Sequence, residues 1–154
     1  MINERLTNVH LTIPGEPRGK ERPRYSNKSK TMYTPTETKN YEKLIAITYK
    51  AAYGNLRFSK GEPLEICIWA YFSIPASDST STRLKKLREI IRPTKKPDWD
   101  NIGKIVADAL NGIAYHDDAQ IVDAVTRKFY SETPRLEIVI RAADKDLQRK
   151  EIGK

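Results

Sequence analysis

Five aspartates are gathered in a short segment of a chain that is otherwise strongly basic. The protein has 154 residues and a formal net charge of +8. Gathered carboxylates repel one another and destabilise a fold unless a cation or a raised pKa relieves the repulsion. Carboxylate oxygens are also the usual ligands of hard divalent ions such as magnesium. The segment therefore predicts a metal site. Its acids are Asp98, Asp100, Asp108, Asp117 and Asp118.

A helix is predicted to position most of these acids. It begins at Asp100, runs to about Asn111 and is closed by Gly112. Apolar residues recur at i, i+3, i+4 and i+7 and are expected to face the core. They are Ile102, Ile105, Val106, Ala109, Leu110 and Ile113.

The polar residues of this helix share one narrow stripe, because their spacing is i, i+4, i+8 and i+11. They are Asp100, Lys104, Asp108 and Asn111. Asp98 precedes the stripe at its N-terminal end. The Asp117–Asp118 pair follows the turn at Gly112, and it returns towards the stripe if a strand at 120–130 runs beside one at 63–74.

Each acid also has a simpler interpretation. Asp100 is a good N-cap residue, Asp108 can pair with Lys104 on a helix surface, and Asp117–Asp118 can form a turn. Separately these interpretations suffice, but together they do not explain why the acids converge. The chemistry that needs such a cluster is phosphodiester hydrolysis, in which metal activates water and a lysine, here Lys104, stabilises the transition state. His10 and His116 are separated and lack cysteine partners, which argues against zinc.

A basic loop at 14–35 is the second functional candidate. Its cations are Arg18, Lys20, Arg22, Arg24, Lys28 and Lys30, and between residues 18 and 30 they are opposed only by Glu21. Tyr25 and Tyr33 are interleaved and can stack on exposed bases. A second basic strip leads up to Asp98 and consists of Arg83, Lys85, Lys86, Arg88, Arg92, Lys95 and Lys96. These residues predict DNA binding, although a solvated loop is the alternative.

The remaining pattern predicts a single domain, 1–154, of the α/β (α+β) class with a mixed sheet packed against helices. Expected strands cover 7–13, 63–74, 120–130 and 135–141, with a hairpin turn at Glu132–Pro134. Expected helices cover 37–52, capped by Thr36 and facing inward through Tyr41, Leu44, Ile45 and Thr48, and 81–91. The tail from Asp144 is charged. No membrane segment or signal peptide is evident, so a cytoplasmic protein is expected.

Several segments carry a resemblance to a known family. They read KPDWDN at 96–101, DALNG at 108–112, YHDDAQI at 115–121, GKERPRY at 19–25 and YTP at 33–35. From about residue 8 to 141 the chain resembles the RusA-type Holliday-junction resolvases, which prophages often carry. The resemblance implies catalytic roles for Asp98, Asp100, Lys104 and Asp118.

The resemblance also implies a cofactor and a partner. Asp98, Asp100 and Asp118 would bind magnesium, or manganese as a substitute, with Asp117 assisting. The protein would be a homodimer that nicks four-way junctions symmetrically in recombination and repair. Two alternatives are a flap or fork nuclease and a non-catalytic nucleic-acid-binding module. The dimer contact is expected on strand 63–74, with Trp69 and Tyr71, or on helix 37–52.

Overall fold

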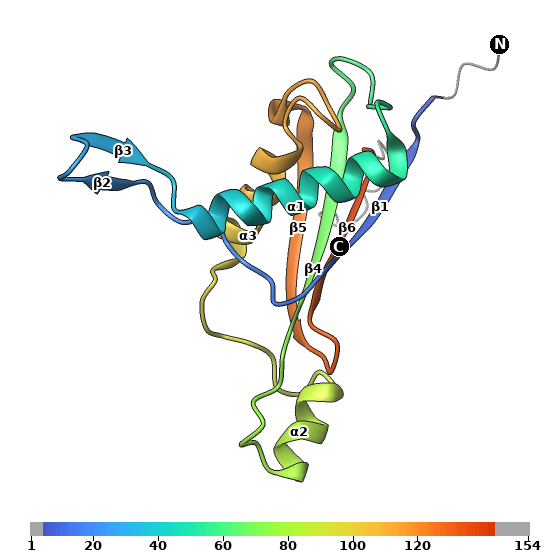
Figure 1. The fold of residues 1–154 in the computed structure, drawn as a ribbon. Coiled ribbons are helices and arrows are strands. Elements are labelled where there is room, and N and C mark those ends of the chain that lie inside the picture. The colour runs from blue at the N-terminus through green and yellow to red at the C-terminus, as the bar shows by residue number, and fades with distance from the viewer. Residues whose placement is uncertain (1–4, 144–154) are drawn as a thin grey trace, which may run out of the picture.

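A four-stranded mixed sheet forms the centre of the molecule (Figure 1). The computed structural model describes residues 5–143. The strand order is β1 (Asn8–Pro14), β6 (Arg135–Ala142), β4 (Leu64–Phe72) and β5 (Ile121–Tyr130). Only β4 and β5 pair in parallel, and the other two pairings are antiparallel. The mixed sheet and its three α-helices confirm the predicted α+β class.

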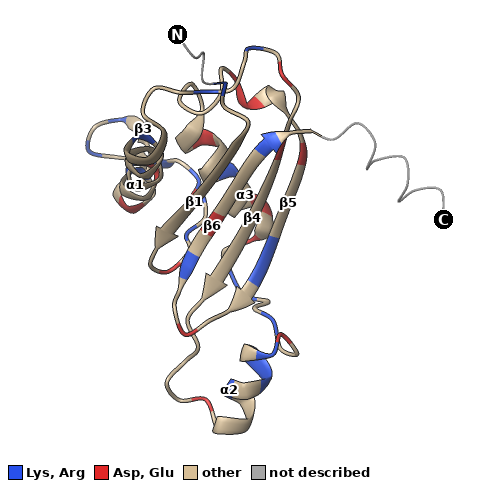
Figure 2. Cartoon of the chain, turned by 90° about the vertical axis from the view of Figure 1, so that its right-hand side faces the viewer, with Lys and Arg blue, Asp and Glu red and all other residues tan. Residues whose placement is uncertain are grey.

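Two helices cover one face of the sheet. They are α1 (Thr36–Tyr53) and α3 (Trp99–Leu110), which also pack against each other. Side chains alternate strictly along β4, so that Leu64, Ile66 and Ile68 are buried while the residues between them are only half-buried. Figure 2 looks onto the opposite face, which no helix of the described chain covers.

The connection from β4 to β5 decides where the aspartates lie. Parallel neighbouring strands need a crossover, and here it carries α2 (Thr80–Leu87) and then α3. α3 therefore runs back along the sheet, and β5 starts near its C-terminal end. Strands 63–74 and 120–130, whose pairing was the condition for Asp117–Asp118 to return towards α3, are neighbours in the sheet.

The predicted hairpin between the last two strands is wrong. β5 and β6 follow one another with a short turn, but β4 lies between them in the sheet. The turn passes the end of β4, where the N–H of Ser131 donates to the carbonyl of Phe72 at 2.9 Å. Sequence spacing predicted the turn, but strand pairing depends on long-range packing.

The ends and faces of two helices also differ from prediction. α1 begins at Thr36 itself, with Pro35 in the N-cap position and no side-chain cap. Its buried residues are Thr38, Tyr41, Ile45 and Tyr49, whereas Leu44 is exposed and Thr48 half-buried. The buried face of α1 therefore includes Tyr49 and excludes Leu44, so it is turned about the helix axis relative to the predicted face. α2 ends at Leu87, before the predicted 91, and Glu89 then adopts a positive φ of 63°.

A small hairpin within the basic loop was missed. β2 (Arg24–Ser26) and β3 (Thr31–Tyr33) pair antiparallel, and they project from the N-terminal end of α1 away from the main sheet (Figure 1). Each strand has only three residues, most of them exposed, so no alternation of hydrophobicity marks it.

No helix among the described residues is long and apolar enough to cross a membrane. The predicted charged tail from Asp144 lies outside the described residues.

Candidate functional site

The first turn of α3 carries two of the predicted metal ligands. Asp98 occupies the N-cap position with φ −69° and ψ 151°, yet its side chain makes no capping hydrogen bond. Trp99 begins the helix and is 65% exposed, and Asp100 follows in the first turn. The interpretation of Asp100 as the N-cap is therefore wrong. Neither carboxylate accepts a capping hydrogen bond from the helix backbone, although the helix dipole favours negative charge at this end.

Two lysines stand near this helix. Lys104 is exposed and forms no ion pair with any described residue, so the simple Lys104–Asp108 surface pair is absent. Lys128, on β5, donates from Nζ to the carbonyl of Lys95 at 2.5 Å. Burial lowers the pKa of Lys128, while the charge of nearby Asp98 opposes that change. Sequence reasoning missed Lys128. Its side chain points to the same face of β5 as that of Thr126, two residues earlier, and Thr126 lies beside Gly103 of α3.

The C-terminal end of α3 holds the second pair of aspartates. The N–H of Asp118 donates to Oδ1 of Asn111 at 3.2 Å, which fixes this pair to the end of the helix. Asp117 caps the short helix η1 (Asp118–Gln120) by accepting from the N–H of Ala119 at 2.9 Å. Asp117 therefore has a structural role in addition to its predicted metal role.

The pKa values of the neighbouring Asp117 and Asp118 carboxyl groups are shifted in opposite directions. Burial raises the pKa of Asp118, and the hydrogen bond and charge of Asp117 and the charge of Asp108 raise it further. The pKa of exposed Asp117 is lowered, first by the Ala119 N–H and then by its hydrogen bond to Asp118. A cation bound beside Asp118 would offset the burial and the negative neighbours that raise its pKa.

Asp108 lies on the polar stripe but has a partner in the basic loop. Nζ of Lys20 forms an ion pair with Asp108 at 3.3 Å and another with Glu42 of α1. Burial alone would lower the pKa of Lys20, but the hydrogen bonds and charges of Glu42 and Asp108 outweigh it and raise the pKa. The loop is therefore not opposed by Glu21 alone, and Glu42 is a residue that sequence reasoning missed.

The basic loop packs tightly on the start of α3. The N–H of Lys20 donates to the carbonyl of Asn101 at 2.8 Å. A Cβ on Gly19 would lie 2.8 Å from Cβ of Pro97, closer than carbon atoms pack, so only glycine fits without a shift. Loop and helix together border a groove of about 930 Å³ that reaches Asp98. Predicted site residues along it are Arg18, Lys20, Arg22, Arg24, Lys96 and Asp98.

The predicted DNA-binding cations differ in their surroundings. Arg18 pairs with Glu37 at 2.8 Å, and Arg24 with Glu21 at 3.1 Å. Arg22 has no ion-pair partner among the described residues. Lys28 and Lys30 lie at the turn of the β2–β3 hairpin, and Lys95 and Lys96 precede Asp98; all four are exposed.

The structure brings the predicted metal ligands together in two groups. Asp98 and Asp100 lie at the start of α3, whereas Asp117 and Asp118 lie beyond its end with Asp108 nearby. A helix of 12 residues separates the groups by about 18 Å. Among residues 5–143, no three His, Cys, Asp or Glu side chains stand close enough to hold a metal ion as arranged. The donor chemistry suits magnesium, since it often uses only one or two carboxylates plus water and substrate phosphate. Chelation by three aspartates stays a prediction.

Fold and site define a class of protein: a small α+β domain of a strongly basic chain, with a groove that is lined by charged residues and reaches the Asp98 carboxylate. This arrangement suits the handling of a polyanion such as nucleic acid. Residues 14–141 match the family described as endodeoxyribonuclease RusA, and the chain belongs to that family. The "Uncharacterized protein YqaN" of Bacillus subtilis (strain 168) is 38% identical over 137 residues, covering 86% of this chain and 95% of that protein. The likeness thus extends over nearly the whole relative.

Proposed function

We propose that this protein is a magnesium-dependent endonuclease that resolves Holliday junctions by paired symmetric nicks, in DNA recombination and repair. Membership of the RusA family supports endonuclease activity on branched DNA. One structural observation carries the proposal further. Asp98 and Asp100 lie at the start of α3 without capping hydrogen bonds, and Asp98 lines a groove together with Arg22, Lys96 and other charged residues.

Asp98 and Asp100 are the proposed primary ligands, because both carboxylates are exposed and face the positive end of the helix dipole. When bound, magnesium would lower the pKa of an attacking water and shield charge that develops on the phosphate. Lys104 lies one turn further along α3 from Asp100, and its unpaired ammonium is available to contact a phosphate oxygen. Half-buried Lys128 holds the 95–98 segment through the carbonyl of Lys95.

Asp118 is the proposed third catalytic carboxylate, assisted by Asp117. Its raised pKa reflects partial burial and two negative neighbours, and a cation would remove that repulsion. The distance along α3 means that Asp118 acts on a second ion, or joins the first group only after rearrangement or from a second copy of the chain. Asp108 is assigned to holding Lys20 rather than to metal.

DNA is proposed to approach along the groove. Cations border it, and the β2–β3 hairpin extends it with Tyr25 54% exposed and Tyr33 44% exposed. Lys and Arg contacts to phosphate would supply affinity without reading sequence, while exposed tyrosines can stack on unpaired bases. A homodimer would present two such grooves to the two equivalent strands of a four-way junction.

The deciding experiment compares cleavage of a synthetic four-way junction, a flap and a linear duplex, with and without magnesium. Symmetric nicks in the junction alone, only with metal, are expected. Preferential cutting of the flap would favour a flap or fork nuclease. Binding of all three without cutting would favour a non-catalytic module.

Asp100→Asn tests the chemistry directly. The change removes one negative charge but no hydrogen bond of the helix, since Asp100 is not the cap. We expect a folded protein that binds junctions at least as tightly, because repulsion of phosphate falls, but cleaves them at least about 100-fold more slowly, in line with losses on removing metal-site or transition-state groups. Near-normal magnesium-dependent cleavage would exclude Asp100 from the reaction.

A further inference from the structure

Gln120 ends the short helix that carries Asp118, and its side chain points away from solvent. The residue is only 9% exposed. A carboxamide has two N–H donors and an oxygen that accepts two hydrogen bonds, and leaving such groups unmet in a buried place is costly. The partners of the Gln120 amide therefore show which segments of the chain it holds together.

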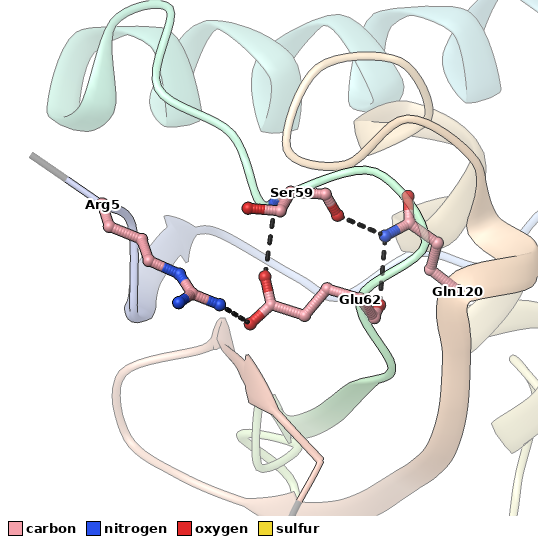
Figure 3. A network of polar contacts seen from close by, with 4 residues as sticks. All are labelled: Arg5, Ser59, Glu62 and Gln120. Carbon is pink, nitrogen blue, oxygen red and sulfur yellow. Dashed lines mark hydrogen bonds and ion pairs between the residues drawn. The ribbon is translucent and has the colours of Figure 1, made fainter. Parts of the chain in front are cut away.

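All four hydrogen-bonding positions of the Gln120 amide are filled by backbone groups. Oε1 accepts from the N–H of His116 at 3.0 Å and of Asp117 at 3.2 Å. Nε2 donates to the carbonyls of Ser59 at 2.9 Å and Glu62 at 3.0 Å, as Figure 3 shows. The amide can take only this orientation, since the reverse would face donors with donors and acceptors with acceptors.

The segment on the far side of the amide is itself held in place. The Glu62 carboxylate accepts from the N–H of Ser59 at 3.3 Å and from Arg5 at 3.2 Å (Figure 3). One residue earlier, the N–H of Phe58 donates to the carbonyl of Ala114 at 2.8 Å. Residues 58–62, between α1 and β4, therefore form a brace beside residues 114–120.

We propose that Gln120 is a positioning residue for Asp118, which ties the aspartate-bearing loop to the 58–62 brace. This inference rests on the proposed catalytic role of Asp118 and adds the residue that holds it. The backbone of Asp118 is then fixed on two sides: by Asn111 at the end of α3 and, through its neighbour Asp117, by Gln120. Residues that orient a metal ligand in this way commonly affect metal affinity or activity by 10- to 100-fold.

A purely local role is the competing explanation, because Gln120 also completes a capping box with Asp117 on η1. Two substitutions separate these roles. Gln120→Glu keeps an acceptor for the two loop N–H groups but loses both donors to Ser59 and Glu62. Gln120→Met removes acceptor and donors together at similar volume. Arg5→Ala is the control, since it cuts only the exposed end of the network, where the Arg5 side chain is 70% exposed.

The test combines three measurements on the full chain. Amide hydrogen exchange of peptides spanning 114–121 reports whether the loop is held. Manganese affinity without DNA reports the carboxylates. Cleavage of a four-way junction at saturating DNA reports the reaction. For Gln120→Glu and Gln120→Met we expect faster exchange, about 10-fold weaker manganese binding and 10- to 100-fold slower cleavage. Junction affinity measured in calcium should stay unchanged, and Arg5→Ala should match the original protein.

Three outcomes overturn the inference. Unchanged exchange in Gln120→Met means that the amide does not hold the loop. Faster exchange with normal manganese affinity and normal cleavage means that Asp118 does not need to be held. A normal Gln120→Glu beside a defective Gln120→Met leaves only the local cap. If the original protein cuts no DNA, the proposed function fails, while exchange and manganese binding still decide the role of Gln120.

Discussion

Lys20 joins three parts of the chain at one ammonium group. The ammonium group forms ion pairs with Glu42 on α1 and Asp108 on α3. The backbone N–H of Lys20 also donates a hydrogen bond to the carbonyl of Asn101. The Lys20 side chain is only 20% exposed, so water screens these ion pairs less than pairs on the surface. One lysine thus compensates two acids next to the candidate site.

Lys20→Met should destabilise the protein by about 1–3 kcal/mol, because it leaves two partly buried carboxylates without their cation. Arg18→Met is the matched control. It breaks a pair whose side chains are 49% and 69% exposed and should cost less than about 1 kcal/mol. Urea unfolding of both variants measures the difference. Equal costs would mean that Lys20 contributes no more than a surface pair.

At the scale of elements, α3 and the basic loop pack together as one structural unit. The close packing of Gly19 against Pro97 and the bond from Lys20 to Asn101 set the loop along the start of the helix. The hairpin β2–β3 continues this loop outward from the body (Figure 1). The segment proposed to bind DNA and the helix that bears the proposed catalytic carboxylates therefore adjoin in the fold, although they are far apart in sequence.

Replacing Arg22 and Arg24 together by Ala should weaken junction binding without unfolding the protein. Each lost phosphate contact lowers the slope of log affinity against log salt by about one unit. Binding measured in calcium between low and physiological salt gives the slope. An unchanged slope and affinity would mean that this part of the loop is only solvated.

Local patterns predicted the elements well, but not their partners. The apolar spacing of α3 gave its buried face correctly, with Ile102, Ile105 and Val106 fully buried and Ile113 only partly so. The five aspartates were expected to converge, but in the structure they lie in two groups, one at each end of α3. Spacing along a helix aligns side chains on a face but leaves them separated by the rise of 1.5 Å per residue. The Lys20 side chain points inward because it pairs with Glu42, and no local sequence pattern links these two residues.

At the scale of the whole molecule, one face of the sheet is covered by no helix of the described chain (Figure 2). Val139, Cys67 and Val125 stand in one row across the central strands, with Trp69 in the next row. Charged residues share this face: Glu137, which forms an ion pair with Arg135, lies directly opposite Trp69. A second copy of the chain, related by a two-fold axis, would cover the same residues on both protomers.

We expect a dimer in solution that uses this face rather than α1. Trp69→Glu should then shift the protein to monomer, because the contact would bury one unpaired carboxylate from each protomer. Ile47→Glu, at a site 63% exposed on α1, should leave the dimer intact. Light scattering at micromolar concentration measures the mass of each. Dissociation by Ile47→Glu alone would move the interface to α1, and a monomeric original protein that still nicks junctions would favour the flap-nuclease alternative.

The placement of Trp99 gives the molecule an optical signal of its own. The chain has two tryptophans, and they report on different places: Trp99 lies between Asp98 and Asp100, while Trp69 lies on the uncovered sheet face. With Trp69 replaced by Phe, the remaining emission comes from an indole that is 65% exposed at the start of α3. Nucleobases that stack on an aromatic ring remove it from water. Fluorescence from this one residue can therefore time the arrival of DNA at the carboxylates separately from the cutting that follows.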